Sequence, residues 1–206
     1  MTTTTEETQA ARPAGRPRSA RAEKAIIDAT LDLIGEGMSL AELSIEAIAA
    51  RAGVGKTTIY RRWSNKEDLV VDAMAQLKTP LPELRGRSVR EDLTAYLEVV
   101  RRDACDARSR CVMNIAMNDA ERHPRLVERI HQAAIEPRRA ALTALLQRGV
   151  AAGELRADLD LSITMASLVG TMMWYTRTTA GYQEGELPDD LAERVVDQLL
   201  AGLTPR

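Results

Sequence analysis

The segment that most restricts the fold of this chain runs from Ser44 to Leu69 and reads SIEAIAARAGVGKTTIYRRWSNKEDL. Its first part repeats apolar residues at intervals of three and four, which predicts a short helix, and Ser44 stands where an N-terminal cap is expected. Gly53 follows this repeat directly and offers a left-handed residue at which a helix ends and the chain reverses. A second short helix is expected from Lys56 onward. The segment therefore predicts two short helices joined by a tight turn.

The same segment is locally basic within a slightly acidic chain. The formal net charge of the 206 residues is −2, so the protein as a whole is not attracted to a polyanion. Between Arg51 and Lys66, however, there are five basic residues and no carboxylate. A helix-turn-helix places its second helix in the major groove of DNA, and a local basic patch supports that interpretation.

An alternative interpretation treats Gly53 to Thr58 as the end of a phosphate-binding loop. The full motif requires a glycine at position 50, where this chain has Ala50, and a buried strand in front of the loop. Residues 44–52 have helical periodicity instead. The nucleotide-binding interpretation therefore fails two conditions of its motif.

Residues 21–77 resemble the N-terminal domain of the TetR family of bacterial transcriptional repressors. The family pattern combines an apolar first helix, a glycine and a helix-turn-helix, and it is matched by Ile26, Ile27, Ala29, Leu33, Gly37, Ile48, Ala49, Ala52, Gly53, Val54, Thr58, Tyr60, Lys66 and Leu69. The chain departs from the pattern at Gly55, where serine is usual, at Thr57, where glycine is common, and at Trp63, where phenylalanine is common. Gly55 and Thr57 bear on the DNA sequence that is recognised, not on the fold.

The first twenty residues lack apolar periodicity and predict a disordered basic arm. No apolar stretch follows their basic residues, so they do not read as a signal peptide. Gly15 to Arg18 resembles the core of an AT-hook, and arginines on an extended arm suit the minor groove. The alternative is an untethered solubilising tail.

The expected DNA-binding residues lie in this arm and in the helix-turn-helix, and they are Arg12, Arg16, Arg18, Ser44, Lys56, Thr57, Thr58, Tyr60, Arg61, Arg62 and Lys66. Lys56, Thr57 and Thr58 begin the second helix, whose N-terminal end faces base edges. The hydroxyl and cationic side chains that follow suit phosphates. The family resemblance implies phosphate contacts for the three matching positions Tyr60, Arg62 and Lys66.

The residues after the second helix predict the start of a further helix and a buried tryptophan. Ser64 and Glu67 have the spacing of a capping box at the start of a further helix. Trp63 is expected to be a core residue that holds the helix pair together.

The remaining chain predicts an all-α fold with a disordered basic arm at 1–20, a three-helix DNA-binding domain at 21–77, and a helical effector-binding and dimerisation domain at 78–206. Helices are expected over 88–104, 109–120, 124–152, 160–179 and 188–203, with a kink at Pro137. No apolar run is long enough to cross a membrane.

The last two helices predict a homodimer. The helix near the C-terminus carries an apolar stripe, and the one before it is apolar nearly all round, so it must be buried on several sides. The residues expected at the dimer surface are Leu168, Val195, Val196, Leu199 and Leu203. A palindromic site on DNA also requires two copies of the reading helix.

An effector cavity is expected in the helical domain, with an apolar or mixed lining, because methionine adapts to such ligands. Its candidate residues are Tyr96, Met113, Met117, Met165, Met172, Met173, Trp174 and Arg177. The effector itself is not identified by the sequence.

Catalysis and metal binding find no support in the sequence, and no cofactor is expected. His123 and His131 are eight residues apart, which does not place two ligands on one helix face. Cys105 and Cys111 form no CxxC pair and indicate a reducing cytoplasm, with a thiol switch as a minor alternative. The resulting expectation is a cytoplasmic, ligand-responsive repressor of double-stranded DNA. A ligand-independent regulator, an activator, and an enzyme that uses the cavity remain the alternatives.

Overall fold

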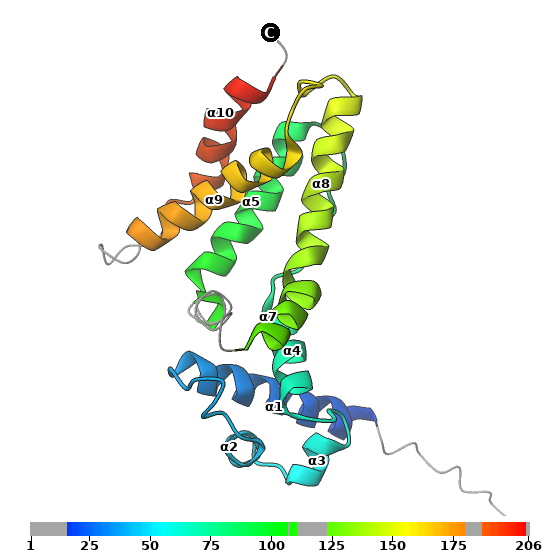
Figure 1. The fold of residues 1–206 in the computed structure, drawn as a ribbon, viewed down its shortest axis with the longest axis vertical. Coiled ribbons are helices and arrows are strands. Elements are labelled where there is room, and N and C mark those ends of the chain that lie inside the picture. Colours follow the sequence, from blue (N-terminus) through cyan, green and yellow to red (C-terminus); the bar gives the residue numbers. More distant parts are fainter. Residues whose placement is uncertain (1–15, 107, 111–122, 180–186, 205–206) are drawn as a thin grey trace, which may run out of the picture.

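The structure is a computed structural model that describes residues 16–106, 108–110, 123–179 and 187–204. Within these ranges the chain forms helices and no strand, which confirms the predicted all-α fold. Four helices build one end of the molecule: α1 (Arg16–Gly35), α2 (Ile45–Ala52), α3 (Lys56–Tyr60) and α4 (Lys66–Leu77). Figure 1 shows α1 lying across this end, with α2 and α3 below it and α4 leading into the rest of the molecule.

Local signals in the sequence produce the helix-turn-helix. The Ser44 side chain accepts a hydrogen bond from the backbone N–H of Ala47, as expected for an N-cap. Gly53 ends α2 with φ 65° and ψ 35°, a left-handed conformation that a residue with a Cβ adopts only with strain. Both predictions are confirmed.

The start of α4 differs from the prediction. Asn65, not Ser64, is its N-cap, and the Asn65 side chain accepts a hydrogen bond from the N–H of Asp68 at 2.9 Å. The capping box between Ser64 and Glu67 was therefore wrong by one residue. Asparagine and serine cap helices about equally well, so the sequence did not separate the two.

One hydrophobic core lies among the first four helices. Its fully buried side chains include Ile26, Ile34, Ile48, Ile59 and Leu69. Leu126 and Ile130 of α7 (Pro124–Ile130) also pack into it. Residues from beyond position 78 thus complete the core of the end that α1–α4 form, which we call the reading end.

A second core fills the other end of the molecule. It is built by α5 (Val89–Cys105), α8 (Glu136–Ala151), α9 (Leu161–Thr179) and α10 (Leu191–Leu203). The central helix is α5, which packs against α8, α9 and α10 (Figure 1).

Two parts of the backbone depart from the expected boundaries. Residues 16–20 belong to α1, although the sequence placed them in a disordered arm. The helix expected over 124–152 is interrupted by a π-helical segment, η1 (His131–Ile135), between α7 and α8. Pro137 follows this segment and has no N–H to donate to the preceding turn, which accounts for a break at this place. The helix expected over 109–120 lies almost entirely outside the described residues.

Candidate nucleic-acid interface

The short helix α3 presents a polar face to solvent. Ile59 is fully buried and anchors the helix in the first core. Lys56, Thr57 and Tyr60 are exposed, with 54% of Tyr60 accessible, whereas Thr58 is half-buried. Because Ile59 holds the opposite side, the exposed residues are positioned together on the outer side of α3.

Arg61 follows this face and is the basic residue most available to a ligand. Its side chain is exposed, and among the described residues no acceptor lies within hydrogen-bonding distance of it. An exposed guanidinium of this kind suits a phosphate oxygen.

Tertiary packing supplies the carboxylates that the segment itself lacks. The Arg51 guanidinium donates two hydrogen bonds to Glu36, at 2.7 and 2.8 Å. The Lys56 ammonium donates to Glu46 on α2, and this bond lowers the pKa of the Glu46 carboxyl and raises that of Lys56. Arg51 and Lys56 are therefore already paired, both at exposed positions.

Arg62 serves the fold, contrary to the phosphate role expected for it. Its side chain is only 18% exposed and lies 3.7 Å from a carboxylate oxygen of Glu23. The guanidinium donates to the carbonyl of Thr58 at 3.1 Å, and to the carbonyl and hydroxyl oxygens of Ser19 at 2.9 and 2.7 Å. Arg62 thus ties the end of α3 to the start of α1.

Lys66 likewise makes its hydrogen bonds within the protein. Its ammonium donates to the carbonyl oxygens of Leu40 and Leu43, at 2.8 and 2.7 Å. These carbonyls belong to the turns just before α2. Lys66 thus ties the start of α4 to the loop that precedes the helix-turn-helix, and its expected phosphate contact stays a prediction.

We predict that Lys66→Met lowers stability by about 2 kcal/mol, because hydrogen bonds from a charged donor contribute about 1.5–3 kcal/mol. This loss corresponds to a melting temperature lower by about 4–8 °C, measured by thermal unfolding. Lys56→Met is the matched control, since an exposed ion pair contributes little. Equal melting temperatures for the two variants would instead favour the phosphate contact.

The predicted core residue Trp63 and the remaining expected DNA-binding residues take different places. Trp63 is buried and its indole N–H donates to Asp72 at 3.0 Å, so its predicted core role is confirmed. Ser44 is half-buried, and its oxygen caps α2. Arg12 lies outside the described residues. Arg16 and Arg18 are in the first turn of α1, but their side chains are not described.

The described candidates for the effector cavity do not converge. Tyr96 is buried, its hydroxyl donates to the carbonyl of Arg138 at 3.2 Å, and burial raises its pKa. Met172 is also buried, and Met165 and Met173 are half-buried. Trp174 is 72% exposed, which does not fit the expected place in a cavity wall. Met113, Met117 and the side chain of Arg177 lie outside the described residues.

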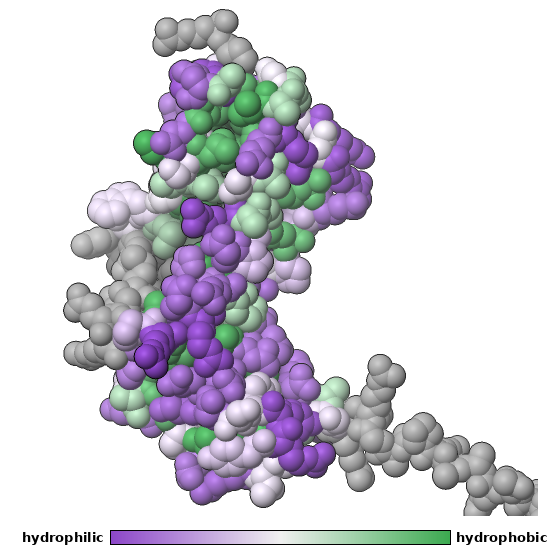
Figure 2. All heavy atoms as spheres, turned by 45° about the vertical axis from the view of Figure 1, so that its right-hand side comes forward, coloured by the Kyte–Doolittle hydropathy of each residue, from purple (hydrophilic) through white to green (hydrophobic). Residues whose placement is uncertain are grey.

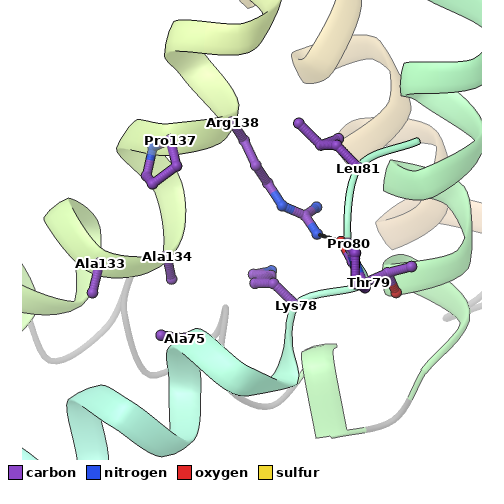
Figure 3. A pocket seen from close by; sticks show the side chains of 9 residues that line it. All are labelled: Ala75, Lys78, Thr79, Pro80, Leu81, Ala133, Ala134, Pro137 and Arg138. Atoms are coloured by element: carbon purple, nitrogen blue, oxygen red, sulfur yellow. Dashed lines mark hydrogen bonds between the residues drawn. The ribbon is translucent and has the colours of Figure 1, made fainter. Parts of the chain in front are cut away.

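A cavity of about 250 Å³ lies elsewhere, where α4 meets α8. None of the predicted effector residues lines it, and its wall consists of Ala75, Lys78, Thr79, Pro80, Leu81, Ala133, Ala134, Pro137 and Arg138. Figure 3 shows Lys78 and Arg138 extending into this space from opposite sides. No sequence pattern predicts this cavity, because its wall is assembled from two segments far apart in the chain, 75–81 and 133–138.

Most of the expected dimer residues are buried within their own chain. Leu168, Val195 and Val196 are buried in the second core, and Leu199 and Leu203 pack against it. Leu168, Val195 and Val196 are therefore core positions, which corrects their assignment to the dimer surface. Leu199 and Leu203 are half-buried, and their role at a dimer surface stays a prediction.

The exposed side of α9 is the alternative. Ile163 and Trp174 are 64% and 72% exposed at its two ends. Between them, exposed Ala166, Ser167 and Gly170 continue the same face at helical spacing. We name these five residues the α9 stripe. The face of the molecule drawn in Figure 2 is mostly hydrophilic over the end that carries α1–α4, while hydrophobic surface gathers toward the opposite end.

The described residues contain neither a membrane-spanning helix nor a cluster of metal ligands. No described helix has the length and apolar character required to cross a membrane. Within the same residues, no three His, Cys, Asp or Glu side chains group together as ligands for a metal ion.

Comparison with known proteins matches both parts of the chain. Residues 26–73 match the family model described as bacterial regulatory proteins, tetR family, and residues 85–201 match that described as tetracyclin repressor-like, C-terminal domain. The HTH-type transcriptional regulator YdeS of Bacillus subtilis (strain 168) is 31% identical over 163 residues, which cover 78% of this chain and 80% of that protein. The DNA-binding transcriptional repressor TetR of Mycobacteroides abscessus is 32% identical over 161 residues, which cover 76% and 80%.

Solved structures share the fold. The regulator FadR from Bacillus subtilis, solved in complex with stearoyl-CoA, superposes with a TM-score of 0.72 at 22% identity, and the match covers 87% of this chain and 98% of that one. The flavonoid-responsive regulator FrrA gives a TM-score of 0.67 at 21% identity, covering 91% and 99%. These relatives are regulators of transcription and not enzymes.

Proposed function

The chain belongs to the TetR family of bacterial transcriptional regulators, and we propose that it is a repressor that responds to a small molecule. In this proposal a homodimer binds a palindromic operator and leaves it when an effector binds. The observation that carries the proposal is the outer face of α3, where Lys56, Thr57, Tyr60 and Arg61 are exposed around a buried Ile59.

The DNA contacts divide along this face. Lys56 and Thr57 stand at the N-terminal end of α3, the end that meets base edges when such a helix enters the major groove. Tyr60 and Arg61 stand at its C-terminal end and offer a hydroxyl and a guanidinium to phosphates. To contact DNA, Lys56 breaks its ion pair with Glu46 and pairs with a base or a phosphate. This exchange costs little free energy, because both side chains of the ion pair are exposed.

The dimer of the proposal is held by the α9 stripe. A contiguous apolar face that is left exposed on one chain marks an interaction site. Its small residues allow a second helix to approach closely, while Ile163 and Trp174 supply apolar area at the ends of the contact. A dimer built in this way presents two copies of α3, as a palindrome requires.

Three links connect the reading end to the helical body and provide the path for effector action. The Arg129 guanidinium of α7 donates to Asp68 of α4 at 2.6 Å. Arg108 forms ion pairs with Asp28 and Asp32 of α1. The third link joins Arg138 of α8 and Asp103 of α5 to Thr79, just after α4. An effector that favours one arrangement of these links shifts the population between states with different spacings of α3.

The effector is proposed to be a small molecule with apolar character. The fold is shared with regulators whose names include stearoyl-CoA and flavonoid, which supports small-molecule control in this fold. Stearoyl-CoA and flavonoid are named for those two proteins only.

The test is a titration of the purified protein against DNA from upstream of its own gene at several salt concentrations. We predict that Arg61→Ala weakens binding to all sequences alike and lowers the magnitude of the slope of log K against log salt by about 2, because the dimer loses two phosphate contacts. Arg61→Lys is the control, since it keeps the charge.

A salt slope that Arg61→Ala leaves unchanged would remove this residue from the phosphate contacts. Stoichiometric binding of a dimer to a palindrome supports the repressor. Binding that no small molecule alters favours the ligand-independent regulator, and increased transcription from the bound promoter favours the activator.

A further inference from the structure

Three charged side chains are buried together beside the cavity between α4 and α8. Lys78 directly follows α4, Asp103 lies near the end of α5, and Arg138 lies in the first turn of α8. Their side chains are only 11%, 8% and 14% exposed. Lys78 and Arg138 line the cavity itself (Figure 3).

Asp103 accepts three hydrogen bonds from partners other than Lys78. One of its oxygens accepts from the N–H and the hydroxyl of Thr79, at 3.2 and 2.6 Å. The other accepts from the Arg138 guanidinium at 2.7 Å. Arg138 also donates to the carbonyl of Thr79, so the residue after Lys78 is held from both sides.

The ammonium of Lys78 is held less closely by Asp103 than the guanidinium of Arg138 is. It lies 3.7 Å from the nearer oxygen of Asp103, which is an ion pair but longer than a hydrogen bond, and the described residues offer no closer acceptor. Asp106 is the other described carboxylate whose charge reaches it. An ammonium has three donors, so Lys78 can pair with a further acceptor in the cavity that it lines.

The cluster therefore carries more positive than negative charge. Two cations face one buried carboxylate, and Arg138 uses two of its five N–H donors on described partners. Burial lowers the pKa of Lys78, and Arg138 adds to this effect, while Asp103 opposes it. A further anion at this point would pair with both cations and offset the cost of burying them.

Most of the other side chains that line the cavity are apolar. Alanine, proline and leucine side chains from α4, the following linker, η1 and α8 surround the two cations. A volume of about 250 Å³ is below that of cavities for drug-sized ligands, which begin at about 300 Å³. Ala133 and Ala134 belong to the π-helical segment, a backbone irregularity that is frequent at functional sites.

We propose that this cavity binds a short-chain aliphatic monocarboxylate, with its carboxylate held by Lys78 and Arg138 and its alkyl chain against the alanine and proline wall. This inference rests on the proposed function, because it identifies the chemical class of the effector. The ligand would draw Arg138 and Lys78 away from Asp103 and Thr79. Since Thr79 lies two residues beyond α4, the end of that helix shifts with them.

The test is calorimetric titration of the full-length protein, without DNA, with acetate, butyrate and hexanoate. Saturable binding is expected, with a dissociation constant on the order of 1 mM or lower for the longer acids. Butan-1-ol and hexan-1-ol are neutral controls of matched length and are expected not to bind. Lys78→Met should weaken carboxylate binding about tenfold or more, because a charge-assisted hydrogen bond is lost. Lys78→Arg should retain it.

Lys78→Met is expected to fold, since methionine has a similar length and Asp103 keeps Arg138 as its partner. Its melting temperature verifies this. Lys24→Met is the matched control, because Lys24 is 78% exposed and does not line the cavity. Absence of saturable binding, equal binding of the alcohols, or unchanged affinity in Lys78→Met overturns the proposal. The repressor proposal is judged separately by operator binding of the same preparation, so either can fail alone.

Discussion

Replacing Trp174 with glutamate is expected to convert the protein from a dimer to a monomer. The side chain is 72% exposed on the single chain, so the substitution leaves the protomer folded. In a dimer joined through the α9 stripe, the new carboxylate would be buried without a partner, and the area of a tryptophan side chain, about 150–250 Å², would be lost. Operator affinity should fall by about 10²–10⁴-fold, because the two reading helices no longer bind as one unit.

Sedimentation velocity measures the oligomeric state, and DNA titration measures the affinity. Trp174→Phe is the conservative control and is expected to keep both. Val195→Glu provides a contrast, because Val195 is buried in the second core and its replacement should unfold the chain instead of dissociating it. If Trp174→Glu stays dimeric at micromolar concentration, the interface lies on another face.

Asp103→Asn is expected to lower the stability of the folded chain strongly. The change keeps the shape of the side chain but removes the buried carboxylate that, among the described residues, pairs with both Lys78 and Arg138. Removing one partner of a buried ion pair costs about 3–5 kcal/mol, because the remaining charges stay buried without compensation. Thermal unfolding should show a melting temperature lower by about 10 °C.

The cause of this loss can be separated from other effects of the substitution. Asp189→Asn is the matched control, since Asp189 is fully exposed and pairs with Arg101 only at the surface. Adding Lys78→Met to Asp103→Asn should recover part of the stability, because one of the two unpaired cations is then removed. If Asp103→Asn unfolds at the same temperature as Asp189→Asn, the buried cluster contributes nothing to the fold.

Much of the fold could be predicted from the sequence because its signals are local. The cap at Ser44 and the left-handed turn at Gly53 act within one helical turn, so they can be recognised without knowledge of packing. The break near Pro137 follows from the missing N–H of a single residue. Where two adjacent residues could act, as with Ser64 and Asn65, local reasoning selected the wrong one.

The roles of individual charged residues could not be predicted in this way. Arg61 and Arg62 are neighbours of the same type, yet one is exposed and the other is bound to Ser19, which is 43 residues away in the sequence. Lys66 meets the carbonyls of Leu40 and Leu43 because α4 starts beside the loop before α2. A pattern of basic residues indicates a DNA-binding segment but not which of its cations remain available.

The sequence by itself determined the helices, the tight turn and the reading helix, since each depends on interactions between residues a few positions apart. Only the tertiary structure decided which face of each helix is covered. The stripe on α10 was read as an interface, but much of it packs against its own chain, while a face of α9 is exposed. The buried cluster of Lys78, Asp103 and Arg138 is likewise assembled from three segments far apart in the sequence. The physical reason is that periodicity defines an apolar face, while its partner is chosen by the packing of whole helices.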